Sequence, residues 1–122
     1  MLDGAKVLLV EDDPATALMV ESIIAEAHGE VAASCRTLGE ARGFIGTGAG
    51  VDCALLDVHL PEGHSTPLLE ALRHRNIPTV IYTGGGGLPE HVRTRHPDCK
   101  VLAKPVLPAR LIAELRRAIA AA

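Results

Sequence analysis

Short aliphatic runs recur along the chain, and this recurrence restricts the fold more than any other feature. Four runs are plain, at 6–10 (KVLLV), 51–56 (VDCALL), 78–82 (PTVIY) and 99–103 (CKVLA), and a weaker one lies at 30–34 (EVAAS). They are apolar on both of the faces that a strand presents, which is typical of parallel strands covered by helices on each side. We therefore expect five parallel strands.

Helical patterns separate these runs. After Pro14 an apolar stripe is expected from Thr16, Met19, Val20, Ile23, Ile24 and Ala27, at the spacing of an amphipathic helix. Asp13 is placed as its N-cap, and Gly29 lies just past its end. Further helices are predicted at 37–47 from the capping-box pair Thr37 and Glu40, from Thr66 onward, at 89–96, and from Pro108 onward.

The resulting order of elements is βαβαβαβαβα. Right-handed crossovers then give an α/β fold: one open parallel sheet with helices on both faces. With 122 residues the chain is long enough for one core, and we expect a single domain over 1–122 without an output domain.

Composition and charge exclude several classes of function. The net charge is −3, so the chain offers no basic surface for nucleic acid. No apolar run approaches the roughly 18 residues of a membrane span, and the segment MLDGAK at 1–6 lacks the charged and apolar regions of a signal peptide. The three cysteines form no CxxC pair, which favours a reducing, cytoplasmic setting. The loose group of His91, His96 and Cys99 is better explained as a solvated loop than as a zinc site.

Reactive side chains follow the ends of four predicted strands. Glu11 and Asp12 follow the first strand in the chain, Asp57 the run at 51–56, Thr83 the run at 78–82, and Lys104 the last. Ligands of open parallel sheets bind at the carboxyl ends of the strands. These residues are therefore expected to share one site.

The acidic residues of this site need a cation. Two carboxylates about 5 Å apart repel each other by roughly 3 kcal/mol at an effective dielectric of 20, and a third adds to that cost. Mg²⁺ takes oxygen ligands and keeps several waters, so Glu11, Asp12 and Asp57 suit it, and Lys104 offers a second positive charge. Asp57 beside these cations and the Thr83 hydroxyl has what a carboxylate nucleophile needs to accept a phosphoryl group.

The pattern resembles the receiver domain of two-component response regulators over the whole chain. The motifs that carry the resemblance are VEDD at 10–13, LLDVHLP around Asp57, YTG around Thr83, and AKP at 103–105. The resemblance implies a flavodoxin-like, receiver-like five-stranded sheet in the order 2-1-3-4-5. It also implies a signalling module that catalyses only its own phosphorylation and dephosphorylation.

The resemblance also implies roles for individual residues. Asp57 would accept phosphate from a histidine kinase or histidine phosphotransferase. Asp12 would bind Mg²⁺, with Glu11 as the outer acid and the backbone carbonyl of His59 as a further ligand. Lys104 would precede Pro105 across a cis peptide bond.

Two features depart from the family's usual pattern. Val101 stands three residues before Lys104, where receivers commonly have an aromatic switch residue. The glycine run that begins at Gly84 replaces a more ordinary loop and is a candidate for the moving part. Together with the expected lack of an output domain, these features make the chain similar to stand-alone receivers of alphaproteobacteria.

The leading hypothesis is a phosphorylation-dependent receiver without its own effector. It would act either as a switch that binds a downstream protein or as a phosphate sink, and the partner surface expected is the face of the fourth helix, fifth strand and fifth helix. The alternatives are a small Mg²⁺-dependent phosphatase with an aspartate nucleophile, and a flavin binder. The phosphatase would need an acid where His59 stands, and the flavin binder would need more aromatics than Phe44 and Tyr82.

Overall fold

The computed structural model describes residues 1–57, 59–60, 63–64, 66–84, 93–94, 96 and 99–121. In chain order the elements are β1 Lys6–Val10, α1 Pro14–Glu26, β2 Glu30–Cys35, α2 Leu38–Gly46, β3 Cys53–Asp57, β4 His59–Leu60, β5 Gly63–His64, α3 Thr66–His74, β6 Thr79–Thr83, β7 Lys100–Ala103 and α5 Pro108–Ala121. The helix expected at 89–96 falls mostly outside the described residues, of which 93–94 are helical.

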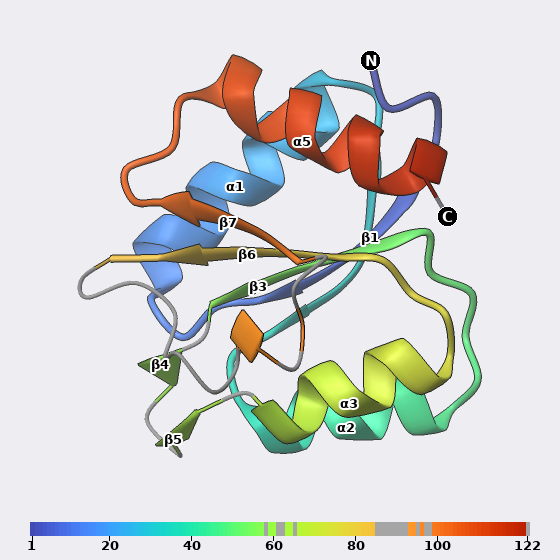
Figure 1. Cartoon of the computed structure of the whole chain (residues 1–122). Coiled ribbons are helices and arrows are strands. Elements are labelled where there is room, and N and C mark those ends of the chain that lie inside the picture. Colours follow the sequence, from blue (N-terminus) through green and yellow to red (C-terminus); the bar gives the residue numbers. More distant parts are fainter. Residues whose placement is uncertain are drawn as a thin grey trace.

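The main sheet is parallel, with the strand order β2-β1-β3-β6-β7 (Figure 1). Counting only these parallel strands, the order is 2-1-3-4-5, so the predicted α/β fold and strand order are confirmed. Each strand begins and ends within two residues of the expected run. The order reverses between β1 and β3, which is where open parallel sheets hold their ligands.

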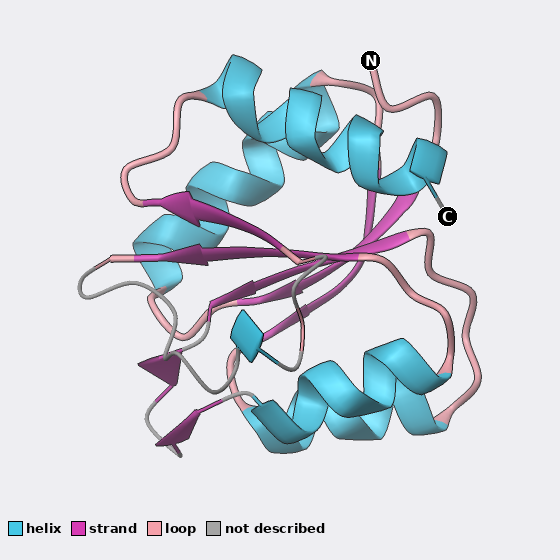
Figure 2. Ribbon diagram, in the orientation of Figure 1, coloured by secondary structure: helices cyan, strands magenta, loops and turns pink. Residues whose placement is uncertain are grey.

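Helices cover both faces of the sheet, with α1 and α5 on one face and α2 and α3 on the other (Figure 2). Strand β1 divides its side chains between the two layers, because successive residues of a strand point to opposite faces. Val7 and Leu9 pack with α1 and α5, whereas Leu8 and Val10 pack with α2 and α3. All four are fully buried, as expected for a strand covered on both sides.

The buried face of α1 differs from the predicted stripe. Val20, Ile24 and Ala27 are buried as expected, but Met19 is 49% exposed and Ala17 is buried instead. The small Ala17 side chain lets the start of the helix approach the sheet, and the longer Met19 is turned outward. Asp13 is the N-cap, as predicted, and its carboxylate accepts from the Thr16 backbone N–H at 2.9 Å.

The end of α1 is closed by a Schellman motif in which His28, not Gly29, has the left-handed backbone, with φ 63°. The N–H of Gly29 donates to the carbonyl of Ile24, and that of His28 to Ala25. Gly29 is required for a different reason. A Cβ atom at this position would lie 2.7 Å from Leu2 Cδ1 and 2.8 Å from Ile24 Cγ2.

We expect Gly29→Ala to lower the free energy of unfolding by about 1–3 kcal/mol, because an added methyl forces buried neighbours to move. Gly43→Ala is the matched control. Gly43 is exposed within α2 and an added Cβ meets nothing within 4 Å, so the helix should gain about 0.5–1 kcal/mol. Urea unfolding of both variants measures the difference. If Gly29→Ala had the same free energy of unfolding as the parent, Leu2 and Ile24 would accommodate the added methyl without cost, which would contradict the prediction.

A short antiparallel hairpin, β4 with β5, follows β3 and was not expected from the sequence. His59 pairs with His64 and Leu60 with Gly63. Two-residue strands carry too few positions for an alternating pattern to be recognised. The capping box of α2, in contrast, is found as predicted, with Thr37 and Glu40 bonded to each other's backbone.

Glu114 is a buried acid on α5 that ties the helix to the last strand. It is 3% exposed, and its carboxylate lies 3.4 Å from Lys100 of β7 and 3.2 Å from both Arg110 and Arg117. Burial alone would raise the pKa of Glu114, but the hydrogen bonds from Arg110 and Lys100 bring it below its ordinary value of 4.5.

A carboxyl whose pKa is lowered by folding contributes stability above its unfolded pKa and loses it as the pH falls through the folded pKa. We therefore expect the parent protein to lose more free energy of unfolding than Glu114→Gln when the pH is lowered from neutrality to below about 4. Chemical denaturation at a series of pH values tests this expectation. Parallel profiles for the two proteins would contradict it.

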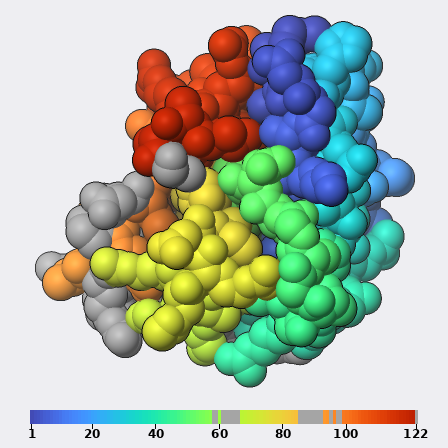
Figure 3. All heavy atoms as spheres, turned by 90° about the vertical axis from the view of Figure 1, so that its right-hand side faces the viewer, coloured from blue at the N-terminus to red at the C-terminus, as the bar shows by residue number. Residues whose placement is uncertain are grey.

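Figure 3 shows α5 beside the N-terminal segment on one face of the molecule. Among the described residues, every helix is too short or too polar to serve as a membrane-spanning segment.

Candidate functional site

The carboxyl ends of β1, β3, β6 and β7 bring the predicted site residues to one edge of the sheet. Asp57 is the last residue of β3, Thr83 is the last of β6, and Lys104 follows β7 directly. The Lys104 backbone N–H donates to the Thr83 carbonyl at 2.9 Å, which continues the ladder one residue beyond the strand. The hydrogen-bonded sheet thus fixes the backbone position of each of these residues.

Glu11, Asp12 and Asp57 form the acidic group that the sequence predicted. Each offers a carboxylate oxygen, and these oxygens lie within 4.8 Å of one another. Glu11 is 1% exposed and Asp57 5%, whereas Asp12 is partly exposed. Asp13 is turned away as the cap of α1, although its backbone N–H donates to Glu11 Oε2 at 3.1 Å.

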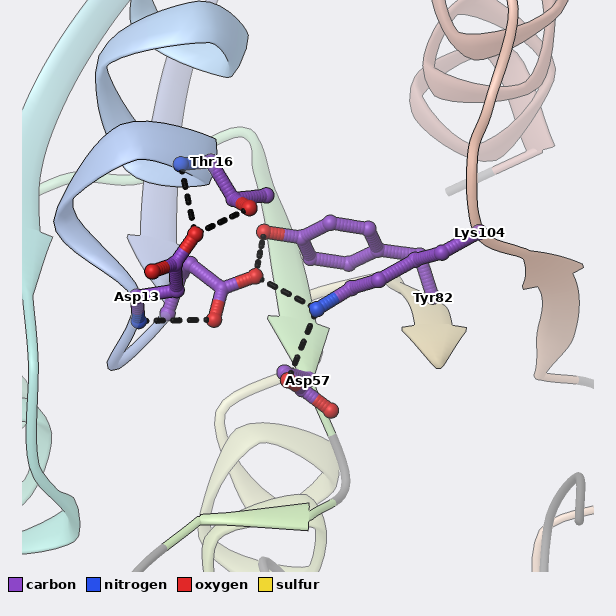
Figure 4. A network of polar contacts seen from close by, with 6 residues as sticks. Asp13, Thr16, Asp57, Tyr82 and Lys104 are labelled. Carbon is purple, nitrogen blue, oxygen red and sulfur yellow. Dashed lines mark hydrogen bonds and ion pairs between the residues drawn. The ribbon is translucent and has the colours of Figure 1, made fainter. Parts of the chain in front are cut away.

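Lys104 bridges two of these acids. Its ammonium nitrogen lies 2.7 Å from Glu11 Oε1 and 2.9 Å from Asp57 Oδ2 (Figure 4). Burial would lower the pKa of Lys104, but its bonds to Glu11 and Asp57 hold the pKa above its ordinary value. The ammonium therefore stays charged at neutral pH and offsets part of the repulsion between the carboxylates.

The two acids of the first pair have opposite electrostatic environments. Burial would raise the pKa of Glu11, but hydrogen bonds from Lys104 and Tyr82 bring it below its ordinary value. Burial raises the pKa of Asp12, and the neighbouring Glu11 raises it further. The repulsion between the carboxylates that Lys104 does not offset therefore acts mainly on Asp12, the most exposed of the three acids.

The Thr83 hydroxyl is an unsatisfied group beside these charges. Thr83 is 4% exposed, and among the described residues its Oγ1 has no hydrogen-bond partner. A buried hydroxyl without a partner costs free energy in a folded protein, and such a group is often completed by a ligand.

The sequence did not assign Tyr82 to this site. Its hydroxyl donates to Glu11 Oε1 at 2.7 Å, and the Lys104 nitrogen lies 4.6 Å from the centre of its ring. Alternation along the strand pointed away from this contact, since Tyr82 directly precedes the site residue Thr83 and neighbouring strand residues point to opposite faces. That alternation alone does not show that the ring reaches the carboxylate of another strand.

The remaining predicted residues are placed as follows. Gly84 is exposed, and a Cβ there would lie 3.8 Å from Lys104 Cδ. Val101 is half-buried and packs against the core layer of α2 and α3. The peptide bond between Lys104 and Pro105 is cis, as the resemblance implied. His59 lies in β4, outside the acidic group, and residues 85–87 of the glycine run lie outside the described residues.

Comparisons with known sequences point to one family. A family model described as the response regulator receiver domain matches residues 7–116. The transcriptional regulatory protein CitT of Halalkalibacterium halodurans is 36% identical over 72 residues, which make up 57% of this chain. The matched stretch is 31% of that protein, so the chain covers less than a third of that relative.

Solved structures agree with this assignment. The chain is similar to SdrG from Sphingomonas melonis, with a TM-score of 0.80, 32% identity, and coverage of 98% of this chain and 99% of that one. A response regulator receiver protein from Sinorhizobium medicae has the same fold, with a TM-score of 0.84, 22% identity, and coverage of 99% and 98%. By the family model that spans most of its length, the chain belongs to the response regulator receiver domains of two-component signalling.

Proposed function

We propose that this receiver domain accepts a phosphoryl group on Asp57 in a Mg²⁺-dependent reaction. The observation that carries the proposal is the position of the Lys104 ammonium, 2.9 Å from Asp57 within a group of three acids at the switch point of the sheet. A structural ion pair would need one acid and one base. Three acids sharing one lysine leave negative charge that suits a further cation.

In the proposed reaction a carboxylate oxygen of Asp57 attacks the phosphorus of a phosphohistidine. An oxygen–phosphorus bond forms and the phosphorus–nitrogen bond breaks. The imidazole leaves with the electron pair, and it is neutral because its other ring nitrogen carries a proton in the phosphohistidine. The Lys104 ammonium moves toward the negative charge of the phosphoryl group and binds one of its oxygens, and the Thr83 hydroxyl donates to another. The Thr83 donor is available because it has no other partner among the described residues.

The acidic group fits Mg²⁺. Its ligand atoms are carboxylate oxygens, which Mg²⁺ prefers, and the partial exposure of Asp12 leaves room for the waters that this ion keeps. Asp12 and Asp57 would hold the ion with the His59 carbonyl, and Glu11 would be the outer acid, since Lys104 and Tyr82 already occupy its Oε1. Bound there, Mg²⁺ would neutralise charge on the transferring phosphoryl group.

The proposed partners are a histidine kinase or histidine phosphotransferase as donor, in the cytoplasm, and a downstream protein that reads the phosphorylated state. We place the downstream contact on β7 and α5, together with the helix predicted from the sequence at 89–96, because Thr83 ends the strand beside β7 and Lys104 follows β7 directly. Val101 and Gly84 would move with Thr83 when Lys104 changes partner. Whether the domain acts as a switch or as a phosphate sink depends on how strongly phosphorylation shifts this equilibrium.

The test is incubation with Mg²⁺ and acetyl phosphate, followed by intact-mass measurement. We expect one added phosphoryl group that is lost in alkali or hydroxylamine, as an acyl phosphate is. No adduct from acetyl phosphate, phosphoramidate or a phosphorylated histidine phosphotransferase would overturn the proposal. Steady release of phosphate from simple esters would instead support the phosphatase alternative.

A further inference from the structure

We propose that Tyr82 is a positioning residue of this site: its hydroxyl keeps Glu11 in place when Lys104 moves to the phosphoryl group. The inference rests on the proposed phosphorylation of Asp57. It adds to the site an aromatic residue that reaches the acids from β6, in a chain whose residue three positions before Lys104 is Val101.

The first step is the hydrogen bonding of Glu11. Its side chain is fully buried, and its Oε1 accepts from both Tyr82 and Lys104, at 2.7 Å each. Its Oε2 accepts from the Asp13 backbone N–H at 3.1 Å. A buried carboxylate needs such donors, because each one lost leaves charge uncompensated in a medium of low dielectric.

Phosphorylation of Asp57 changes the bonding partners of Lys104. The ammonium now divides its donors between Glu11 and Asp57. A phosphoryl group on Asp57 carries more charge than the carboxylate it replaces and draws the ammonium away from Glu11. Glu11 Oε1 then keeps only the Tyr82 hydroxyl. Without that hydroxyl, Glu11 would hold Lys104 back, and transfer would be slower.

The third step is that Tyr82 can stay in place during this change. The residue is 2% exposed and packs in the core layer of α1 and α5, so its hydroxyl is a fixed donor. Figure 4 shows its ring beside the Lys104 side chain, both pointing toward the acids. The centre of the Tyr82 ring lies 4.6 Å from the ammonium nitrogen, and the ring face attracts a cation there without a hydrogen bond.

The test compares Tyr82→Phe with the parent protein under saturating Mg²⁺. The variant keeps the ring and loses only the hydroxyl, and we expect labelling of Asp57 by acetyl phosphate to slow by about tenfold, as for loss of one hydrogen bond to a charged group. Thr16→Val is the matched control. It removes a hydroxyl that bonds the exposed Asp13 carboxylate, and its labelling rate should equal that of the parent.

A second measurement separates positioning from packing and does not need phosphorylation. In a double-mutant cycle of urea unfolding, Tyr82→Phe and Glu11→Gln should be clearly non-additive, because the two groups bond each other. Additive effects, a Tyr82→Phe variant labelled as fast as the parent, or a Thr16→Val control slowed as much as Tyr82→Phe would overturn the role of Tyr82 alone. A parent chain that takes no phosphoryl group from any donor would overturn the proposed function together with this role.

Discussion

Asp57→Asn should take up no phosphoryl group from acetyl phosphate and Mg²⁺, while the parent chain gains one. The amide is a poor nucleophile, and the change removes one of the three carboxylates that face the proposed metal site. The fold should survive, because asparagine has nearly the size of aspartate and Lys104 keeps Glu11 as a partner at 2.7 Å. Intact mass and peptide mapping measure the adduct and its position.

Asp13→Asn is the control for Asp57→Asn. It changes a neighbouring acid that serves α1 as an N-cap, and asparagine caps a helix about as well as aspartate. This variant should be labelled like the parent. A phosphoryl group that persists in Asp57→Asn would move the acceptor to another residue and would contradict the proposed role of Asp57.

Lys104→Met should lower the free energy of unfolding by about 3 kcal/mol at neutral pH without Mg²⁺, because breaking a buried ion pair leaves the partner charge uncompensated. Glu11 has a fully buried side chain, and Lys104 is 23% exposed, so water replaces little of the lost interaction. Methionine keeps the apolar stem, which isolates the effect of the charge. Millimolar Mg²⁺ should restore part of the stability, since an ion that binds only the folded state stabilises it.

Lys100→Met is the matched control for this experiment. Lys100 is 47% exposed, and its partner Glu114 keeps both Arg110 and Arg117. We expect a loss below about 1 kcal/mol, because the Lys100 ammonium is exposed to water and Glu114 keeps two other cations, and no recovery with Mg²⁺. Equal losses for the two lysine variants, or no response of Lys104→Met to Mg²⁺, would contradict the electrostatic account of the site.

Much of the fold could be predicted because it depends on local patterns. The short aliphatic runs identified the parallel strands to within two residues, and Asp13 and the pair Thr37 and Glu40 marked the starts of α1 and α2 correctly. The pattern was less reliable at the level of single side chains. Met19 was expected inside and is 49% exposed, because helical spacing alone does not distinguish it from Ala17 on the adjacent stripe.

The acidic group was also predictable, for a topological reason. Parallel strands that cross over in one hand bring all their carboxyl ends to one edge, so Asp12, Asp57 and Lys104 had to meet once the strands were identified. Distances and bonding partners were not available by that route. That Lys104 bonds both Glu11 and Asp57, and that Thr83 has an unpaired hydroxyl among the described residues, emerged only from the folded structure.

The sequence by itself determined the kind of sheet, the order of its elements and the residues at its strand ends, because hydrophobic period and capping act over a few neighbouring residues. Only the tertiary structure decided which of those residues form hydrogen bonds and ion pairs with one another. Glu11 and Tyr82 are 71 residues apart in the chain, and their bond exists because β1 and β6 are both packed beside β3. Contacts of this kind depend on side-chain reach across the finished sheet, which no local pattern records.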